Sequence, residues 1–480
     1  MKIPPFLLFC GLAAAAPLSV AQADYTLHAT PVHTAPADPA IARAIASISS
    51  ARIHQTIQTL VGFQTRNTLS SMEENLPPGV GVQAAADWIF DQFQDISKEC
   101  GGCLDVRRDI FTAEPDPSSR WGNRVPQPTR ITNVYAILRG SDPAQANRMV
   151  LVTGHYDSRA SNVVDARATA PGANDDASGV AVSFECARAL SQIHFPSSIV
   201  FVAVAGEEQG LFGSAHLAHF AKDQGWNLQA VLNNDIVGGN TTPGDTLQLK
   251  DRVRVFSEGV PAAAPPAQQR RILALGEVND SPSRELARAI EDVDRTYFPA
   301  AGPAQFNAFL VSRPDRYLRG GDHSSFNSEG FAAVRFTEWR EDYNHQHQNV
   351  VRPPAGSKDP VLGDLLEFVD FPYVANVARL NAATLATLAA SPGEPRSVAI
   401  DAKKLENGTT LSWEAAPGSV DHYDLLWRET DAPDWQYVQR VAPPANGAPI
   451  TLTVPISKDN VIFGVRAVDS ADHRGLVVVP

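Results

Sequence analysis

Cysteine is scarce in this sequence, with four residues in a chain of 480. That number is too small for a fold held mainly by disulfides, the solution of small secreted domains that lack a large core. Beyond the N-terminal residues, no apolar run reaches the ~18–20 residues that a membrane-spanning helix needs, so we expect no stable membrane span. A chain of this length can bury a large core and predicts two or three domains.

Positive charge is also in short supply. The chain has 40 Lys and Arg against 53 Asp and Glu, which gives a net charge of −13. A protein of this charge repels phosphates instead of releasing their counterions, so we expect no nucleic-acid partner. Nothing in the sequence predicts an oligomeric state.

The first residues have the pattern of a secretory signal peptide. Residues 1–23 combine Lys2, an apolar run over 6–20 and a small-residue end at Ala23. The run is short and contains a proline, which argues against a membrane anchor. We therefore expect a secreted or periplasmic protein. Residues 24–50, rich in Ala and Pro and without periodicity, are expected to form an extended leader.

In an exported chain, the motif "CGGC" favours a local disulfide between Cys100 and Cys103 across a glycine turn. A redox-active dithiol is the alternative, but no thioredoxin-like pattern surrounds the motif. A zinc knuckle would need a second Cys or His pair, which is missing. Cys10 would leave with the signal peptide, and Cys186 lies in an apolar helical pattern and is expected to be buried.

The middle of the chain alternates apolar runs with helical patterns. Runs that are apolar on both faces predict strands of an α/β fold, in which helices cover a mostly parallel or mixed sheet. We expect such strands at 149–154, 198–208, 228–238 and 331–339. This domain is assigned to residues 51–390, with segment 239–322 as an insert that forms a lid or rim over a cleft.

After residue 391 the pattern changes to short alternating strands with turn signals every eight to twelve residues, which is typical of an all-β sandwich. Trp413 is expected in its core. Residues 391–480 resemble a fibronectin type III module, and "SPGEP" is the expected linker.

Polar residues follow the expected strands at their carboxyl ends, where ligands bind in parallel sheets. Taken singly, each has a structural explanation: a core histidine, an Asp that caps a helix, a solvated pair of loop carboxylates. Their recurrence at one edge of the sheet favours a functional site. The residues are His155, Asp157, Asp175, Glu207, Glu208 and Asp235.

Imidazole and carboxylate are zinc ligands, and this set with one later His exceeds the needs of a single tetrahedral ion with an open position. Two ions with a bridging carboxylate fit the set. Asp175, in a loop flanked by Gly and Ala, is the expected bridge. Asp157 is expected to accept the second ring N–H of His155. Glu207 would face a water molecule as general base, while Glu208 binds metal.

Five blocks in this order, "GHYDSR", "PGANDDASGVA", "AGEEQGLFGS", "NNDIVG" and "DHSSFNSEGFAAVRFTE" with a following His, resemble the M28 family of zinc aminopeptidases, the secreted bacterial leucyl-type group. The resemblance covers residues 130–385. It implies a zinc-exopeptidase, phosphorylase/hydrolase-like fold, two zinc ions per chain and peptide substrates with a free N-terminus. It also implies His155, Asp175, Glu208 and Asp235 as ligands, with Glu207 as the proton shuttle.

The last ligand is open, because the segment after Glu338 offers both His345 and His347. The spacing favours His347, with His345 as the alternative. His323 and Phe326 belong to another family block and are expected to line the substrate pocket. The apolar residues around 326–340 favour an apolar first pocket, although the preferred N-terminal residue cannot be read.

Two rival functions remain beside a secreted two-zinc aminopeptidase. One is a single-zinc acyltransferase like the glutaminyl cyclases of this fold, and the other is a binding protein that has lost the chemistry. The complete ligand set counts against both. A metal count per chain would separate the first rival from a two-zinc enzyme.

Overall fold

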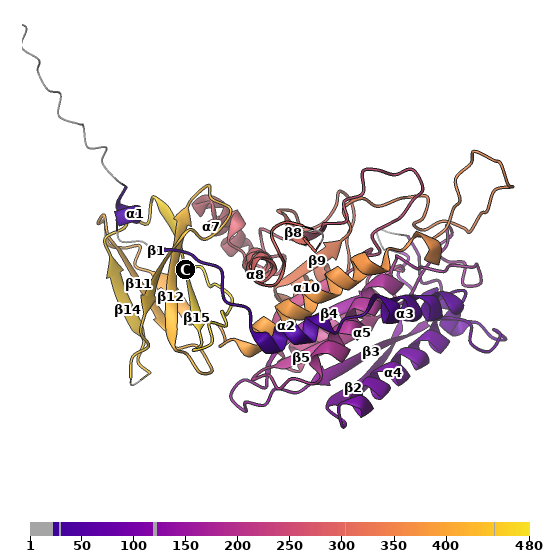
Figure 1. Ribbon diagram of the computed structural model, residues 1–480, viewed down its shortest axis with the longest axis horizontal. Coiled ribbons are helices and arrows are strands. Elements are labelled where there is room, and N and C mark those ends of the chain that lie inside the picture. Colours follow the sequence, from indigo (N-terminus) through magenta and orange to yellow (C-terminus); the bar gives the residue numbers. More distant parts are fainter. Residues whose placement is uncertain (1–22, 28–29, 119–121, 303, 446) are drawn as a thin grey trace, which may run out of the picture.

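The computed structural model describes residues 23–27, 30–118, 122–302, 304–445 and 447–480. The expected signal peptide therefore lies outside the described residues, except for its last position. Figure 1 shows two parts, a large sheet covered by helices and a β-sandwich beside it. Within the described ranges, no helix combines the length and the apolar character that crossing a bilayer requires.

The large sheet is mixed, as predicted. Its four central strands, β5, β4, β6 and β9, are parallel to one another, and antiparallel pairings lie toward both edges. In sheet order the strands are β2 (Leu104–Ala113), β3 (Thr129–Leu138), β5 (Ser198–Val204), β4 (Arg148–His155), β6 (Asn227–Asn234), β9 (Ala333–Thr337), β7 (Arg252–Ser257) and β8 (Asn307–Val311).

Both faces of this sheet are covered, because successive strand residues point to opposite sides. In β4, Val150 and Val152 join one core and Met149 and Leu151 join another. The helices that contribute to the first core include α3 (Ser50–Gly62), α4 (Val82–Glu99), α5 (Ala177–Leu190), α8 (Pro282–Tyr297) and α10 (Phe371–Ala390). The second core lies under α6 (Phe212–Asp223) and α9 (His323–Glu329).

The expected extended leader is only partly extended. After α1 (Asp24–Leu27) and β1 (Thr30–Pro31), the chain forms helix α2 (Pro39–Ala46). Asp38 caps α2 by accepting hydrogen bonds from the backbone N–H groups of its first turn. One side of α2 is buried in the core of the large α/β domain through Ile41, Ala44 and Ile45. The helix has eight residues, too few to show a clear period in the sequence.

The prediction that 239–322 is an insert forming a lid or rim is wrong for most of its length. The segment contributes β7 and β8 to the sheet and α8 to the core that covers it. It also carries α7 (Pro266–Leu275), which has no buried residue. Parts of it, together with neighbouring residues, do line a cleft, described below.

The C-terminal part is a two-sheet antiparallel sandwich, and Trp413 is buried in its core as expected. One sheet has the order β10 (Arg396–Ile400), β11 (Thr409–Glu414), β14 (Ile450–Val454). The other has the order β1, β13 (Tyr437–Val441), β12 (His422–Glu429), β15 (Val461–Val468). Strand β1 comes from the opposite end of the chain, so the sandwich contains more than residues 391–480.

The sandwich is attached to the large α/β domain through buried polar contacts with α8 and the residues just before it. Arg428 of β12 forms an ion pair with Asp280, and both side chains are 1% exposed. Trp435 donates from its indole N–H to Glu285 of α8 at 2.9 Å. Because buried polar groups need their partners, these contacts fix the orientation of the sandwich on the domain.

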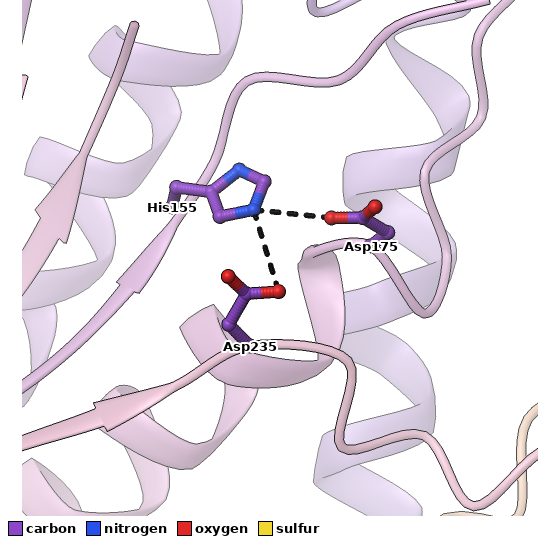
Figure 2. A group of neighbouring side chains, drawn as sticks. All are labelled: His155, Asp175 and Asp235. Atoms are coloured by element: carbon purple, nitrogen blue, oxygen red, sulfur yellow. Dashed lines mark ion pairs between the residues drawn. The ribbon is translucent and has the colours of Figure 1, made fainter. Parts of the chain in front are cut away.

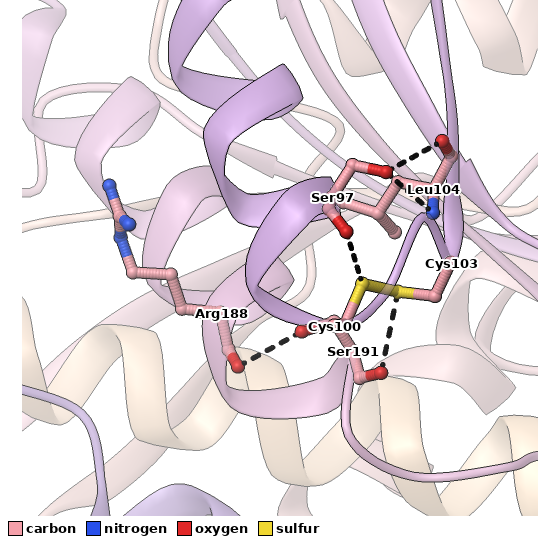
Figure 3. The surroundings of a disulfide bond; sticks show 6 residues. All are labelled: Ser97, Cys100, Cys103, Leu104, Arg188 and Ser191. Atoms are coloured by element: carbon pink, nitrogen blue, oxygen red, sulfur yellow. Dashed lines mark hydrogen bonds between the residues drawn. A yellow bond between two sulfur atoms is a disulfide. The ribbon is translucent and has the colours of Figure 1, made fainter.

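Cys100 and Cys103 form a disulfide, as predicted, at the turn between α4 and β2 (Figure 3). Ser97 closes the same turn. Its hydroxyl donates to the carbonyl of Leu104 at 3.0 Å and accepts the N–H of that residue at 3.1 Å. Cys186 is buried and free, also as expected.

Candidate metal centre

The polar side chains from the strand ends converge on one place. They form two groups that share Asp175: His155, Asp175 and Asp235, and Asp175, Glu208 and His347. The first group is drawn in Figure 2, where all three side chains point toward one another from β4, the loop before α5 and the end of β6. Residues 155 and 347 are far apart in the chain, so the meeting is a product of the fold.

Asp175 lies between the two groups with one oxygen toward each. Its Oδ1 is 3.1 Å from Nε2 of His155, and its Oδ2 is 2.9 Å from Nε2 of His347. Glu208 Oε1 completes the second group at 3.2 Å from His347 Nε2, and Asp235 Oδ1 completes the first at 3.9 Å from His155 Nε2. A carboxylate placed in this way can serve two cations at once.

The donor set fits metal ions. His155, Asp175, Glu208 and Asp235 are all buried, yet Nε2 of His155 and Oε1 of Glu208 have no hydrogen-bond partner among the described residues. A buried polar atom without a partner is costly, and three buried carboxylates that face one another require positive charge. Imidazole nitrogen and carboxylate oxygen are ligands suited to zinc.

The ring of His155 is oriented by Asp157. Its Nδ1 lies 3.1 Å from the backbone carbonyl of Asp157 and 3.5 Å from the Asp157 carboxylate. A carbonyl can only accept, so Nδ1 carries the proton and Nε2 turns its lone pair to the cluster. The closer contact is thus the backbone carbonyl, where the sequence predicted the side chain.

The carboxylate of Asp157 instead fixes the turn that carries the glutamates. It accepts the backbone N–H groups of Glu207 and Glu208 at 3.3 and 3.2 Å, and the hydroxyl of Thr68 at 2.9 Å. Strand β5 already ends at Val204, so both glutamates lie in this turn and not on the strand end.

Glu207 is the member of the pair that faces open space. It is half-buried and lines the cleft beside the cluster, whereas Glu208 is 3% exposed. Burial raises the pKa of Glu207 well above its ordinary value. The negative charges of Asp235 and Glu208 add to that rise. The carboxyl group is therefore placed to take and return a proton at the cleft wall.

Asp235 is held by an arginine that the sequence motifs did not single out. Arg335 of β9 is completely buried, and its Nη2 lies 2.8 Å from Asp235 Oδ1. The positive charge of Arg335 lowers the pKa of Asp235 against the opposing effect of burial. The pairing keeps this carboxylate ionised and in place.

The loop that carries Asp175 is fixed by hydrogen bonds to its backbone. Asp364 accepts the N–H groups of Asn174 and Asp175 at 2.8 and 2.7 Å. Arg66, fully buried, donates to the carbonyls of Pro171 and Gly172 at 2.5 and 2.8 Å.

Helix α5 begins immediately after this loop and approaches β4 closely. Asp176 caps the helix by accepting the N–H of Gly179 at 2.9 Å. Helix capping therefore explains Asp176, but it does not explain Asp175. A Cβ on Gly154 would lie 2.5 Å from the backbone carbon of Gly179, so only glycine at 154 allows this approach.

His347, not His345, reaches the cluster. The ring of His345 stacks on Phe368 with 3.6 Å between centroids, and its Nδ1 lies 3.0 Å from the side-chain oxygen of Asn240. It is structural. His347 adopts a φ of 57°, in the left-handed region, which aims its side chain toward Asp175.

The cleft beside the cluster has a volume of 540 Å³, and its wall combines charged side chains with apolar surface. His323 lines it, as predicted. Phe326 does not, because it is fully buried in the core between α9 and the sheet. The lining includes more charged than apolar side chains; the charged members are Arg124, Arg159, Glu207, Glu208, Glu258, Asp315, Arg316 and Arg319.

Several residues that position the site carry no signal in the sequence. Arg335 lies inside an apolar run. A charged residue there suggests a buried ion pair, but the run does not identify Asp235, after β6, as the partner. Asp364 and Arg66 lie outside every motif, in segments that become neighbours of the 171–176 loop only in the folded chain. Arg159 stands within "TGHYDSR" but had no assigned role.

Comparison with known proteins gives a consistent relationship. Residues 133–356 match the model of Peptidase family M28. A probable zinc metalloprotease of Pyricularia oryzae is 41% identical over 453 residues, which are 92% of this chain and 84% of that protein. One from Leptosphaeria maculans is 40% identical over 438 residues, 91% of this chain and 95% of that protein.

Solved structures resemble the chain more distantly. The LapA aminopeptidase of Legionella pneumophila is 19% identical, with a TM-score of 0.48 over 76% of this chain and 79% of that one. A glutaminyl cyclase of Fimbriiglobus ruber is 18% identical, with a TM-score of 0.44 over 71% of this chain and 95% of that one. Likenesses of this degree do not decide between the two reactions.

Proposed function

The chain belongs to peptidase family M28, and from that premise we propose that it is a two-zinc aminopeptidase acting on peptides with a free N-terminus. The observation that carries the two-metal part is the position of Asp175, with one carboxylate oxygen toward each of two ligand groups. No feature of the site favours a single ion. The aminopeptidase part is supported by the ordered sequence blocks that resemble this group.

His155 and Asp235 would hold one zinc ion, Glu208 and His347 the other, and Asp175 both. Bound zinc lowers the pKa of a coordinated water toward ~7 and polarises a peptide carbonyl. Asp157 keeps the proton of His155 on Nδ1, and Arg335 keeps Asp235 ionised. Glu207, at the cleft wall, takes the proton of the attacking water and returns it to the leaving amine.

We further propose that the protein works outside the cytoplasm, secreted or in the periplasm. The support is the pattern of the first 23 residues and the Cys100–Cys103 disulfide, a bond that persists in oxidising compartments.

The test combines a metal count with a pair of substrates. The purified chain should contain two zinc ions and should release the first residue of an unblocked peptide but not of its N-acetylated form. Exhaustive chelation should abolish turnover, and zinc should restore it. Glu207→Gln should keep both ions and lose about 10²–10⁴-fold in kcat, the usual effect of removing a general base. One zinc per chain, or equal cleavage of the blocked peptide, would contradict the proposal.

A further inference from the structure

The cleft that opens onto Glu207 and Glu208 also contains a group of arginines, and two of them stand next to the candidate metal centre. Arg159 follows Asp157 by two residues, in the loop that begins after the ligand His155 at the end of β4. Arg124 donates from Nη1 to the backbone carbonyl of Glu208 at 2.9 Å. Both are half-buried and line the cleft together with Glu207, Glu208 and His347.

Other charged side chains of this wall are already engaged within the protein. Arg316 pairs with Asp315 at 3.0 Å and with Glu341 at 2.5 Å. Glu258 accepts the N–H of Ala262 at 3.0 Å. Arg319, the remaining arginine of this wall, is exposed and lies over the ring of Tyr343.

Arg159 differs from these neighbours. Its guanidinium donates to two backbone carbonyls of its own loop, those of Ala160 and Ser161, both at 3.2 Å. Among the described residues, none offers it a carboxylate at ion-pair distance. Carbonyl contacts orient the guanidinium but do not neutralise its charge, so Arg159 holds a fixed positive charge at the cleft wall.

The two arginines belong to the wall of one cleft, together with Glu207 and Glu208. Two half-buried like charges repel each other, and an anion bound between them relieves that repulsion. Guanidinium groups match carboxylates geometrically, through two parallel N–H···O bonds.

We propose that Arg159 and Arg124 form a subsite that binds a carboxylate of the peptide substrate. This inference rests on the proposed peptidase function and specifies its substrate class. The carboxylate has two possible sources, the side chain of an acidic residue or the free C-terminus of a short peptide. The subsite is local, because the net charge of −13 repels anions at longer range.

The experiment compares matched dipeptides on the zinc-loaded chain. Leucyl-glutamate amide against leucyl-glutamine amide tests a side-chain carboxylate, and leucyl-leucine against leucyl-leucine amide tests a C-terminal one. We expect the charged member of one pair to exceed its neutral partner about tenfold in kcat/KM, mainly through KM. The pair that shows the preference identifies the source of the carboxylate.

Variants then assign the preference to residues. Arg159→Gln and Arg124→Gln should each lower the charged-to-neutral ratio about tenfold, and Arg159→Lys should lower it less because it keeps the charge. The matched control is Arg313→Gln, which removes an exposed arginine that does not line the cleft. It should leave the ratio as it is. A wild-type ratio near one for both pairs, or a ratio that neither arginine affects, overturns the inference.

A binding measurement tests the carboxylate subsite independently of the proposed aminopeptidase activity. Calorimetric titration of zinc-loaded Glu207→Gln with the same peptides reports affinity without turnover. If the wild-type chain hydrolyses none of the peptides, the aminopeptidase proposal fails. The affinity ratio then decides the subsite alone: about tenfold supports it, and equal affinities overturn it.

Discussion

His345 and His347 stand two residues apart, but only one of them faces Asp175. The family resemblance and the distance from Glu338 predicted a histidine in this segment and favoured His347. They could not choose between the two with certainty, since the direction of a loop side chain depends on backbone angles. His347 has a positive φ that a histidine adopts only when its surroundings impose it.

This difference gives a prediction about metal content. His347→Ala should remove one ligand from the Asp175–Glu208 group and reduce bound zinc from two ions per chain toward one. His345→Ala should keep both ions, because His345 packs on Phe368 and bonds to Asn240 instead. Elemental analysis after dialysis against metal-free buffer would check both variants. Retention of two ions by His347→Ala would remove this residue from the ligand set.

The same reasoning explains why Phe326 was placed wrongly. His323 and Phe326 are three residues apart on α9, so one helix carries both to nearby positions. The sequence placed both in one family block, but it showed neither the helix nor which of its sides meets the sheet. The structure turns Phe326 into the core and leaves His323 at the cleft.

At the level of elements, the strands were the most predictable feature, because parallel strands that are buried on both faces read as continuous apolar runs. The carboxyl ends of β4 and β6 therefore located His155 and Asp235. The turn after β5 located Glu207 and Glu208. The supports of the Asp175 loop were not predictable. Asp364 meets this loop through a long-range contact that leaves no periodic pattern in the sequence.

The role of Asp364 can be tested directly. Asp364→Asn keeps the size of the side chain but replaces one acceptor oxygen with an N–H donor that faces the N–H groups of Asn174 and Asp175. We expect the loop to shift and zinc affinity to fall about 10–100-fold, the usual effect of losing a residue that supports a ligand. Competition with a fluorescent chelator would measure it.

The matched control for this variant is Asp359→Asn, an exposed aspartate in the same connection. It should bind zinc as the wild-type chain does. If Asp364→Asn also bound zinc as tightly as the wild-type chain, the hydrogen bonds from Asp364 would not be needed to hold the loop that carries Asp175.

At the level of the whole molecule, the composition and the change of pattern near residue 391 predicted two structural units, and both are present. The docking between them was not predictable. Asp280 and Arg428 lie in different units and read as ordinary surface charges, yet they pair in a buried interface. The sequence did not predict that β1 belongs to the sandwich, because a strand of two residues has no recognisable pattern.

The buried pair predicts a large effect on stability. Arg428→Ala should lower the free energy of unfolding by about 3–5 kcal/mol, because it leaves the carboxylate of Asp280 buried without its partner. The double variant Arg428→Met, Asp280→Leu should be less affected. Arg295→Ala is the control across the same interface, because its ion pair with Asp434 is exposed and is worth about 0–1 kcal/mol.

Guanidinium unfolding at a fixed zinc concentration would compare these variants. Equal destabilisation by Arg428→Ala and Arg295→Ala would show that the buried pair does not hold the two units together.

The contacts of the N-terminal residues with the sandwich, through α1 as well as β1, have a consequence for how the chain is made. The carbonyl of Tyr25 accepts the indole N–H of Trp427, 402 positions later, and the Tyr25 hydroxyl donates to Glu429. At ~5–20 residues per second, a ribosome reaches Trp427 only tens of seconds after it has built Tyr25. The earliest residues of the sandwich must therefore wait, unpaired, for the last ones, and proteolysis during that interval would leave the finished sandwich with an unsealed edge.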